Sequence, residues 1–158
     1  MQLTLSFVVL VLSATAATAV SAQALDAKIT RPSAIYSSTF KLPGNNIHCQ
    51  YLDHRAPEPA FATFLRCDIE SQLKPMPPRP KNGSCDLDWG GGLVLLKASK
   101  TEVLCAGDTI NGPTYPTLQY GQTWKKSGFT CQSSAKGLTC INSKKQGFFL
   151  SRQEWRSF

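Results

Sequence analysis

The sequence predicts a mainly β protein, built as a small antiparallel sandwich or barrel that disulfide bonds hold together. Three observations support this fold class. The chain contains six cysteines, and three of them follow a hydrophobic residue at the spacing of a strand. Ten prolines and 11 glycines interrupt the chain at short intervals. After residue 22, the sequence has no sustained 3.6-residue apolar period of the kind that predicts an amphipathic helix.

The first 22 residues have the pattern of an export signal. An apolar run ends near Leu12, alanine- and threonine-rich sequence follows, and small residues at 20–22 or 22–24 fit a cleavage site. An uncleaved membrane anchor is the alternative, because about 20 apolar residues can span a bilayer. We expect residues 1–22 to be a signal peptide and residues 23–158 to be a single secreted or periplasmic domain, with no stable membrane span after cleavage.

A short unit occurs three times, with a hydrophobic residue two positions before a cysteine. The units are Asn46–Cys49, Gly128–Cys131 and Gly137–Cys140. Because side chains alternate between the faces of a strand, the hydrophobic residue and the sulfur share a face. Each unit is therefore expected to be a strand that enters the core. His48, one position before a cysteine, is expected on the opposite, solvent-exposed face.

A hairpin is predicted between the second and third units. Residues 132–136 are polar and Gly137 closes them, which is typical of a hairpin turn. Pairing the flanking strands would place Cys131 opposite Cys140. Sequence order then suggests Cys49 with Cys67 and Cys85 with Cys105, which is one of the many pairings that six cysteines allow. Cysteines paired in this way are typical of an oxidising compartment.

Further strands are expected where short apolar segments lie between turn residues. These segments are 34–42, 61–69, 93–97, 101–105, 117–120 and 147–152. Residues 74–80, with four prolines in seven positions, predict an extended polyproline surface loop. Their P-x-x-P spacing also occurs in ligands of peptide-recognition modules.

Several segments taken together resemble a known family. They are Phe40–Asn45 with Ile47–Cys49, Cys67–Ile69, Cys85–Gly90, Cys105–Thr109, Leu118–Gly121, the two Gly-x-x-Cys units, and the closing Gly147–Arg152 with Phe158. The combination is similar to a family of small secreted bacterial disulfide-bonded domains, which is classified only as a domain of unknown function. The resemblance implies an extracytoplasmic, mainly β module and supplies no reaction.

The sequence lacks a complete metal-binding or catalytic motif. Asp86–Asp88 opens like a calcium loop, but Gly90 and Lys97 stand where further oxygen ligands are required. The two histidines, His48 and His54, are too few for a zinc site when the cysteines form disulfides. No serine has the G-x-S-x-G context of a nucleophile elbow. We therefore expect no metal, no other cofactor and no catalytic residues.

Positive charge is concentrated in the C-terminal third. Residues 121–158 contain seven basic side chains against Glu154 alone, which accounts for six of the net charge of +7. Basic residues beside aromatic rings favour an anionic partner, either a cell-envelope polymer or an acidic protein. Nucleic acid fits this charge but not the predicted compartment. The candidate ligand-binding residues are Trp124, Lys125, Lys126, Lys144, Lys145, Arg152 and Arg156.

We expect a non-enzymatic binding module, and two other functions stay open. An envelope hydrolase would use Asp86 or Asp88 with Glu102 as its pair of carboxylates. A secreted enzyme inhibitor would present the loop Pro75–Pro80. Trp89, beside three glycines, is expected to pack against the disulfide of Cys85, and a ligand stacked on its ring is the alternative.

Overall fold

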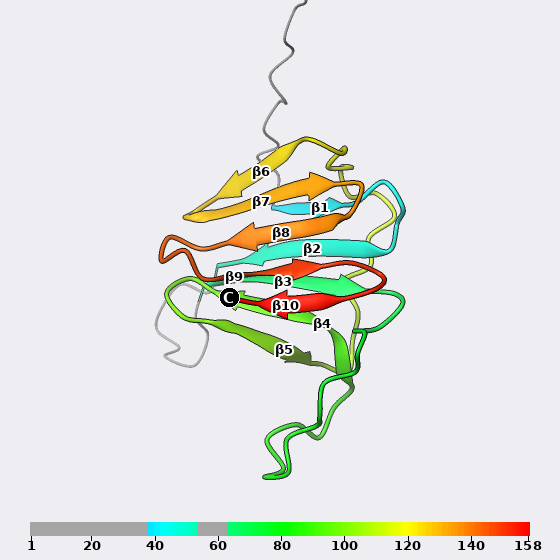
Figure 1. Cartoon of the computed structure of the whole chain (residues 1–158), viewed down its shortest axis with the longest axis vertical. Coiled ribbons are helices and arrows are strands. Elements are labelled where there is room, and N and C mark those ends of the chain that lie inside the picture. The colour runs from blue at the N-terminus through cyan, green and yellow to red at the C-terminus, as the bar shows by residue number, and fades with distance from the viewer. Residues whose placement is uncertain (1–37, 54–62) are drawn as a thin grey trace, which may run out of the picture.

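The computed structural model describes residues 38–53 and 63–158, and these residues form ten strands in two antiparallel sheets (Figure 1). The predicted signal peptide and His54 lie outside the described residues. The first sheet contains β1 (Thr39–Lys41), β2 (Ile47–Leu52), β3 (Phe64–Ile69), β4 (Trp89–Leu96) and β5 (Thr101–Cys105). The second contains β6 (Thr123–Lys126), β7 (Phe129–Ser134), β8 (Gly137–Ile141), β9 (Gly147–Leu150) and β10 (Trp155–Ser157).

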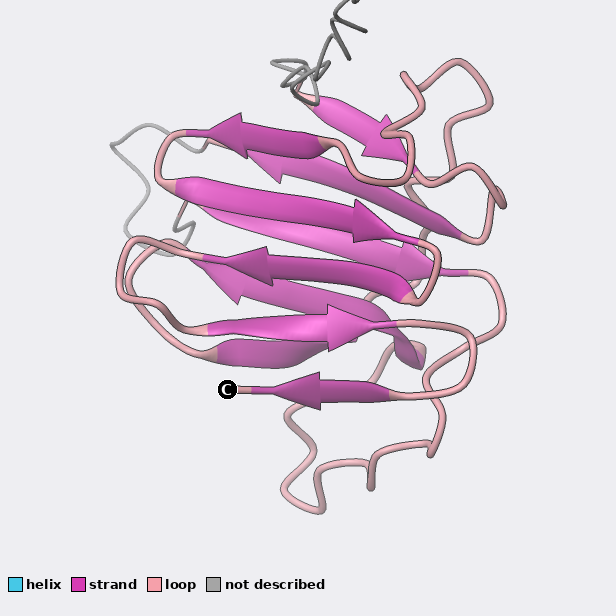
Figure 2. Cartoon of the chain, turned by 45° about the horizontal axis from the view of Figure 1, so that its top comes forward, coloured by secondary structure: helices cyan, strands magenta, loops and turns pink. Residues whose placement is uncertain are grey.

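Each sheet is a meander, in which strands that follow one another in the chain lie side by side. The chain therefore completes one sheet before it begins the other. The two sheets lie as two layers, one over the other (Figure 2), with β1 and β6 at one edge and β5 and β10 at the other (Figure 1). Of the two architectures left open by the sequence, the structure is the sandwich.

The core lies between the sheets and has one matching row in each. The row in the first sheet is Phe40, Cys49, Cys67 and Leu93, and the row in the second is Trp124, Cys131, Cys140 and Phe148. All eight side chains are fully buried. The rows meet where the rings of Phe40 and Trp124 pack with their centroids 5.0 Å apart. Removing such surfaces from water is the main favourable contribution to folding.

The three predicted disulfide pairings are confirmed. Cys49–Cys67 and Cys131–Cys140 each join residues that stand directly opposite one another on neighbouring strands, with Cα atoms 4.1 Å apart in both. Cys85–Cys105 joins the long β3–β4 loop to the end of β5, over a Cα distance of 5.8 Å. The hydrophobe-x-Cys units place their sulfurs in the core, as the alternation of side chains predicts.

The predicted strands differ from the structure at several ends. β4 begins at Trp89, four residues before the predicted start, while β5 has the predicted bounds. Residues 117–120 were expected to be a strand and form only a single parallel bridge, from Thr117 to Lys41. The short strands β6 and β10 were not predicted. β6 pairs with β7, and β10 pairs with β9. Without these partners neither strand can be identified, because three or four residues are too few to show an alternating pattern.

The expectation that His48 is exposed is wrong. Its ring does lie on the face of β2 away from the core, but Gly112 and Tyr115 of a distant loop lie against it, and only 5% of the residue is exposed. The backbone amide of Gly112 donates to Nδ1 of His48 over 3.3 Å, and Nε2 lies 3.1 Å from the carbonyl oxygen of Asn45. A loop from a distant part of the chain thus buries a residue that alternation alone places in solvent.

Candidate functional site

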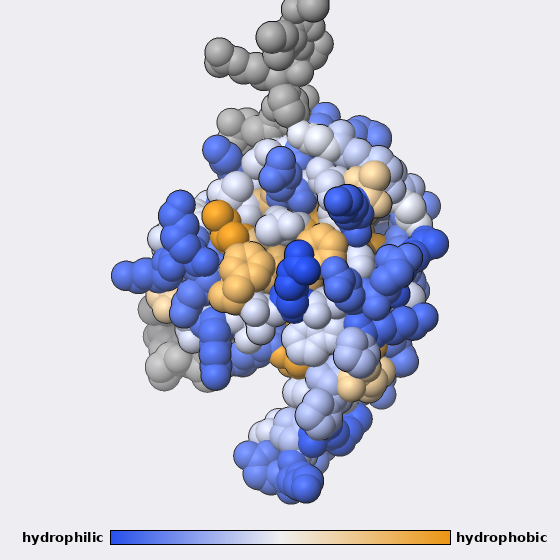
Figure 3. Space-filling model, in the orientation of Figure 1, coloured by the Kyte–Doolittle hydropathy of each residue, from blue (hydrophilic) through white to orange (hydrophobic). Residues whose placement is uncertain are grey.

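Three turns meet at one end of the sandwich, and lysines lie in them or in the strand end beside them. The turns are the β4–β5 turn, the β6–β7 turn and the β8–β9 turn, at the left of Figure 1. We call the surface they form the lysine end, and define it by Lys97, Lys100, Lys125, Lys126, Lys144 and Lys145. Hydrophilic side chains cover this end in the space-filling view (Figure 3). Four of these lysines were candidates from the sequence, and the structure adds Lys97 and Lys100.

Asn142 holds two of these turns together. Its side-chain nitrogen Nδ2 donates to the carbonyl oxygens of Leu96, over 3.0 Å, and Ser99, over 2.9 Å. Its oxygen Oδ1 accepts from the backbone amides of Lys144, at 2.9 Å, and Gln146, at 3.1 Å. Asn142 is buried, so these four bonds satisfy a polar side chain that water does not reach. The β4–β5 and β8–β9 turns are consequently fixed to each other.

Further contacts connect the two sheets at the same end. The hydroxyl of Thr101, the first residue of β5, donates to the carbonyl oxygen of Gly147, the first residue of β9, over 2.9 Å. The β6–β7 turn lies beside the β8–β9 turn, since a Cβ placed on Gly128 would be 3.7 Å from Cβ of Ser143. The ammonium of Lys126 lies 5.4 Å from the centre of the Tyr51 ring in β2. The lysine end therefore spans both sheets.

The local backbone also directs lysines outward. Lys145 adopts a left-handed conformation, with φ of 64°, which lets the β8–β9 turn close with a hydrogen bond from its amide to the carbonyl oxygen of Asn142. Lys97, Lys100, Lys125, Lys144 and Lys145 are exposed. Among the described residues, two acids are close in the chain to the strand ends on this side, Asp53 directly after β2 and Glu102 near the start of β5. Within residues 38–53 and 63–158, six cations against these two acids leave this end positive.

Three of the predicted ligand-binding residues lie elsewhere. Trp124 is fully buried against Phe40 in the core, so its ring is not a surface for a ligand. Arg152 lies in the β9–β10 turn, at the opposite end of the sandwich. Arg156 lies in β10, with its guanidinium 4.7 Å from the centre of the Phe149 ring and 3.4 Å from Glu154. These residues are close to the lysines in the sequence, but the meander of strands places them in other parts of the structure.

The carboxylates proposed for a hydrolase do not share one cleft. Asp88 lines a cleft of about 570 Å³ together with Asp108 and Trp89. Glu102 instead lines an adjacent groove with Phe64 and Val94, and Leu104 and Ala106 border both hollows. Asp88 and Glu102, the pair suggested by the sequence, therefore line two adjacent hollows and not the same one.

Asp108 at the rim of that cleft pairs with a buried arginine. Arg66 donates to both oxygens of Asp68, at 2.7 and 2.9 Å, and to Oδ1 of Asp108 at 2.9 Å. Burial by itself lowers the pKa of Arg66, and the hydrogen bonds and charges of Asp68 and Asp108 outweigh burial, so the pKa is raised above its usual value. A permanently charged guanidinium held in this way is a structural clamp between β3 and the 106–112 loop.

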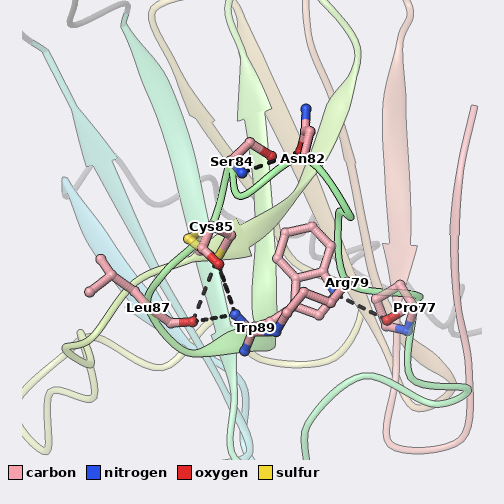
Figure 4. Close-up of a disulfide and its surroundings, with 8 residues drawn as sticks. Pro77, Arg79, Asn82, Ser84, Cys85, Leu87 and Trp89 are labelled. Carbon is pink, nitrogen blue, oxygen red and sulfur yellow. Dashed lines mark hydrogen bonds between the residues drawn. A yellow bond between two sulfur atoms is a disulfide. The ribbon is translucent and has the colours of Figure 1, made fainter.

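The polyproline loop is bound to the protein's own surface. The indole nitrogen of Trp155 donates to the carbonyl oxygen of Pro75 over 2.9 Å, and that of Trp89 donates to Pro77 over 3.0 Å. Arg79 points back into the loop and donates to the carbonyl oxygens of Cys85 and Leu87, each at 2.9 Å (Figure 4). Trp89 is half-buried and supports the loop beside the Cys85 disulfide.

The described part of the chain contains neither a cluster of metal ligands nor a membrane-spanning helix. Within residues 38–53 and 63–158, His, Cys, Asp and Glu side chains form no group of three or more with the spacing of a metal site. Over the same ranges, no helix has the length and apolar character needed to cross a membrane.

Comparison with known proteins supports the resemblance seen in the sequence. The sequence profile of a family of unknown function, DUF6636, matches residues 8–158. No curated protein and no solved structure matches the chain. The matched range includes both sheets, the three disulfides and every residue of the lysine end. The chain therefore belongs to DUF6636, a family of unknown function.

Proposed function

We propose that the protein is a non-enzymatic binding module that attaches to an anionic polymer or an acidic protein through its lysine end. The observation that supports this proposal most is that lysines from two turns and from the end of β6, and so from both sheets, lie at one end of the sandwich. Lysines that only keep a protein soluble can be spread over its surface. Clustering them is unfavourable, because their positive charges repel one another. An anionic partner removes that repulsion.

The chemistry of the lysine end fits repeated anionic groups. Each ammonium is a compact point charge with three donors, which suits phosphate, carboxylate or sulfate without demanding one geometry. A polymer that carries such groups has condensed counterions, and the lysines release these ions when they bind. The hydrogen bonds of Asn142 hold Lys144 and the β4–β5 turn in place before the partner arrives. This reduces the ordering cost of association.

The setting we propose is the periplasm or the cell exterior. Three disulfides are typical of proteins in an oxidising compartment, and the predicted signal peptide provides the route of export. Cell-envelope polymers are the anions that such a protein meets first. Nucleic acid has suitable charge but is not expected in that compartment.

Cosedimentation with isolated cell envelopes tests the proposal. Oxidised protein is mixed with envelopes at NaCl concentrations from about 50 to about 500 mM, beside a variant with Lys144→Glu and Lys145→Glu. The bound fraction of wild-type protein is expected to fall steeply with salt, because several counterions are released on binding. The variant is expected to bind weakly at every salt concentration.

A matched control has the same change of net charge in another place. Lys74→Glu with Lys81→Glu alters two exposed lysines of the β3–β4 loop, and this variant is expected to bind like wild type. Circular dichroism confirms that each variant is folded. Absence of wild-type binding at low salt, or equal loss in both variants, would contradict a role for the lysine end.

A further inference from the structure

A pocket of about 250 Å³ lies at the end of the sandwich opposite the lysine end. Its walls come from the β1–β2, β7–β8 and β9–β10 turns, together with Tyr120 from the segment before β6. We call it the Arg152 pocket. It is smaller than the roughly 300–1,000 Å³ typical of pockets for drug-sized ligands. Its volume suits a ligand the size of a single sugar ring or head group.

The charged side chains that line the Arg152 pocket are positive. Lys136 and Arg152 are the charged side chains among the residues that line it, and no carboxylate is among them. Nη2 of Arg152 donates to the carbonyl oxygen of Gly44 over 3.2 Å, which orients the guanidinium at the rim. The remaining N–H groups of a guanidinium form a planar fork that matches the two oxygens of a carboxylate.

The turns that carry these cations are held by local hydrogen bonds. The hydroxyl of Ser151 accepts from the amides of Gln153, at 3.2 Å, and Glu154, at 3.0 Å. Across the pocket, the hydroxyl of Ser134 donates to the carbonyl oxygen of Gly137 over 3.0 Å and closes the β7–β8 turn around Lys136. These local hydrogen bonds fix the backbone of the site.

Tyr120 gives the pocket an aromatic wall. It is 52% exposed, and it lies in a turn that is anchored to the sheet. The amide of Gly121 donates to the carbonyl oxygen of Ser133 over 2.8 Å. Leu42 and Ile47, both buried, complete an apolar side of the pocket. Flat apolar faces of a ligand can pack on these groups.

We propose that the Arg152 pocket binds a sugar acid, as a single residue of an acidic glycan. The carboxylate would lie between Arg152 and Lys136, and the less polar face of the sugar ring would lie on Tyr120. The pocket is a second site, since it is at the opposite end from the lysine end. Its recognition is by shape and by one carboxylate, whereas the lysine end responds to charge density.

Titration of the oxidised protein with D-glucuronate, followed by NMR of the backbone amides, tests this proposal. D-glucose is the neutral probe of the same ring size, and inorganic phosphate is the anion without a ring. Glucuronate is expected to give saturable shifts at residues 134–137 and 151–153 at concentrations up to about 20 mM. Glucose is expected to give none, and phosphate to bind at least about tenfold more weakly.

Variants separate the pocket from general charge. Arg152→Gln is expected to weaken glucuronate binding at least about tenfold, and Tyr120→Ala by a few-fold. Lys144→Gln with Lys145→Gln, at the other end, is expected to leave it unchanged. Both altered pocket residues are exposed, and unchanged amide spectra elsewhere verify the fold. Equal binding of glucose, binding of phosphate as tight as that of glucuronate, or no saturable shift in these turns would overturn the proposal.

Discussion

Asn142 and Ser99 belong to turns of different sheets, and the side-chain amide of Asn142 donates a hydrogen bond to the carbonyl oxygen of Ser99 over 2.9 Å. Through its oxygen, the same side chain accepts from the amide of Lys144. One buried residue thus fixes the lysines of the β4–β5 turn relative to those of the β8–β9 turn. The proposed binding surface depends on tertiary structure and is not a basic segment of the chain.

Replacing Asn142 with alanine should both destabilise the protein and weaken envelope binding. The substitution leaves two amides and two carbonyls without their partner, and we expect a loss of about 2–3 kcal/mol in the free energy of unfolding. Urea denaturation of the oxidised protein measures this. Asn82→Ala is the matched control, because Asn82 is exposed and accepts one bond, from the amide of Ser84. Its effect should stay below about 1 kcal/mol, and equal effects of the two substitutions would contradict the role of Asn142.

Trp124→Ala should act on stability and not on binding. Removing the ring from its contact with Phe40 leaves a cavity between the sheets, which should cost about 3–5 kcal/mol. The milder Trp124→Phe should lose less and remain folded. Envelope binding of folded Trp124→Phe is expected to equal that of wild type. Loss of binding in a well-folded Trp124 variant would contradict this view and show that Trp124 contributes to the ligand site.

The three disulfides should differ in their access to reductant. The cysteines of Cys49–Cys67 and Cys131–Cys140 are fully buried, whereas Cys105 of the third pair is half-buried. A thiolate must reach a sulfur to exchange with it, so limiting dithiothreitol without denaturant should open Cys85–Cys105 first. Alkylation followed by peptide mass spectrometry identifies the cysteines that react. Earlier labelling of Cys131 or Cys140 would show that burial does not set the order.

The two acids bound to Arg66 should contribute unequally. Asp68 is buried with Arg66, with side chains 7% and 9% exposed, while the side chain of Asp108 is 75% exposed. Asp68→Asn leaves a buried cation without its main counter-charge and should destabilise by about 3 kcal/mol or more. Asp108→Asn should cost less than about 1 kcal/mol, because solvent screens an exposed pair. Thermal or urea unfolding of both variants makes the comparison, and the reverse ranking would contradict this view of the network.

The core of the fold could be predicted from local pattern. A hydrophobic residue two positions before Cys49, Cys131 and Cys140 is enough to place both side chains on one face, and the order of the cysteines then suggested the correct pairs. These features depend on alternation within a strand and on a short hairpin. Both are determined by residues that are close in the chain.

The rest depends on contacts between distant segments. The sequence does not implicate Lys97 in binding, because nothing in it places the β4–β5 turn beside the β8–β9 turn. His48 is buried by a loop more than 60 residues away, whose Gly112 amide bonds its ring. Arg152 is close to Lys145 in sequence and lies at the other end of the sandwich, because β9 intervenes. A meander separates neighbours in sequence by the length of each strand.

The most direct test of the lysine end changes the lysines that sequence alone does not implicate. Envelope binding at about 50 mM NaCl is compared for wild type, Lys97→Glu with Lys100→Glu, and Lys144→Glu with Lys145→Glu. If the two turns form one surface, each pair of reversals should lower affinity by roughly tenfold or more, because each removes contacts that release counterions. Wild-type affinity in Lys97→Glu with Lys100→Glu, beside a loss in the other pair, would contradict a shared surface and confine binding to the C-terminal sheet.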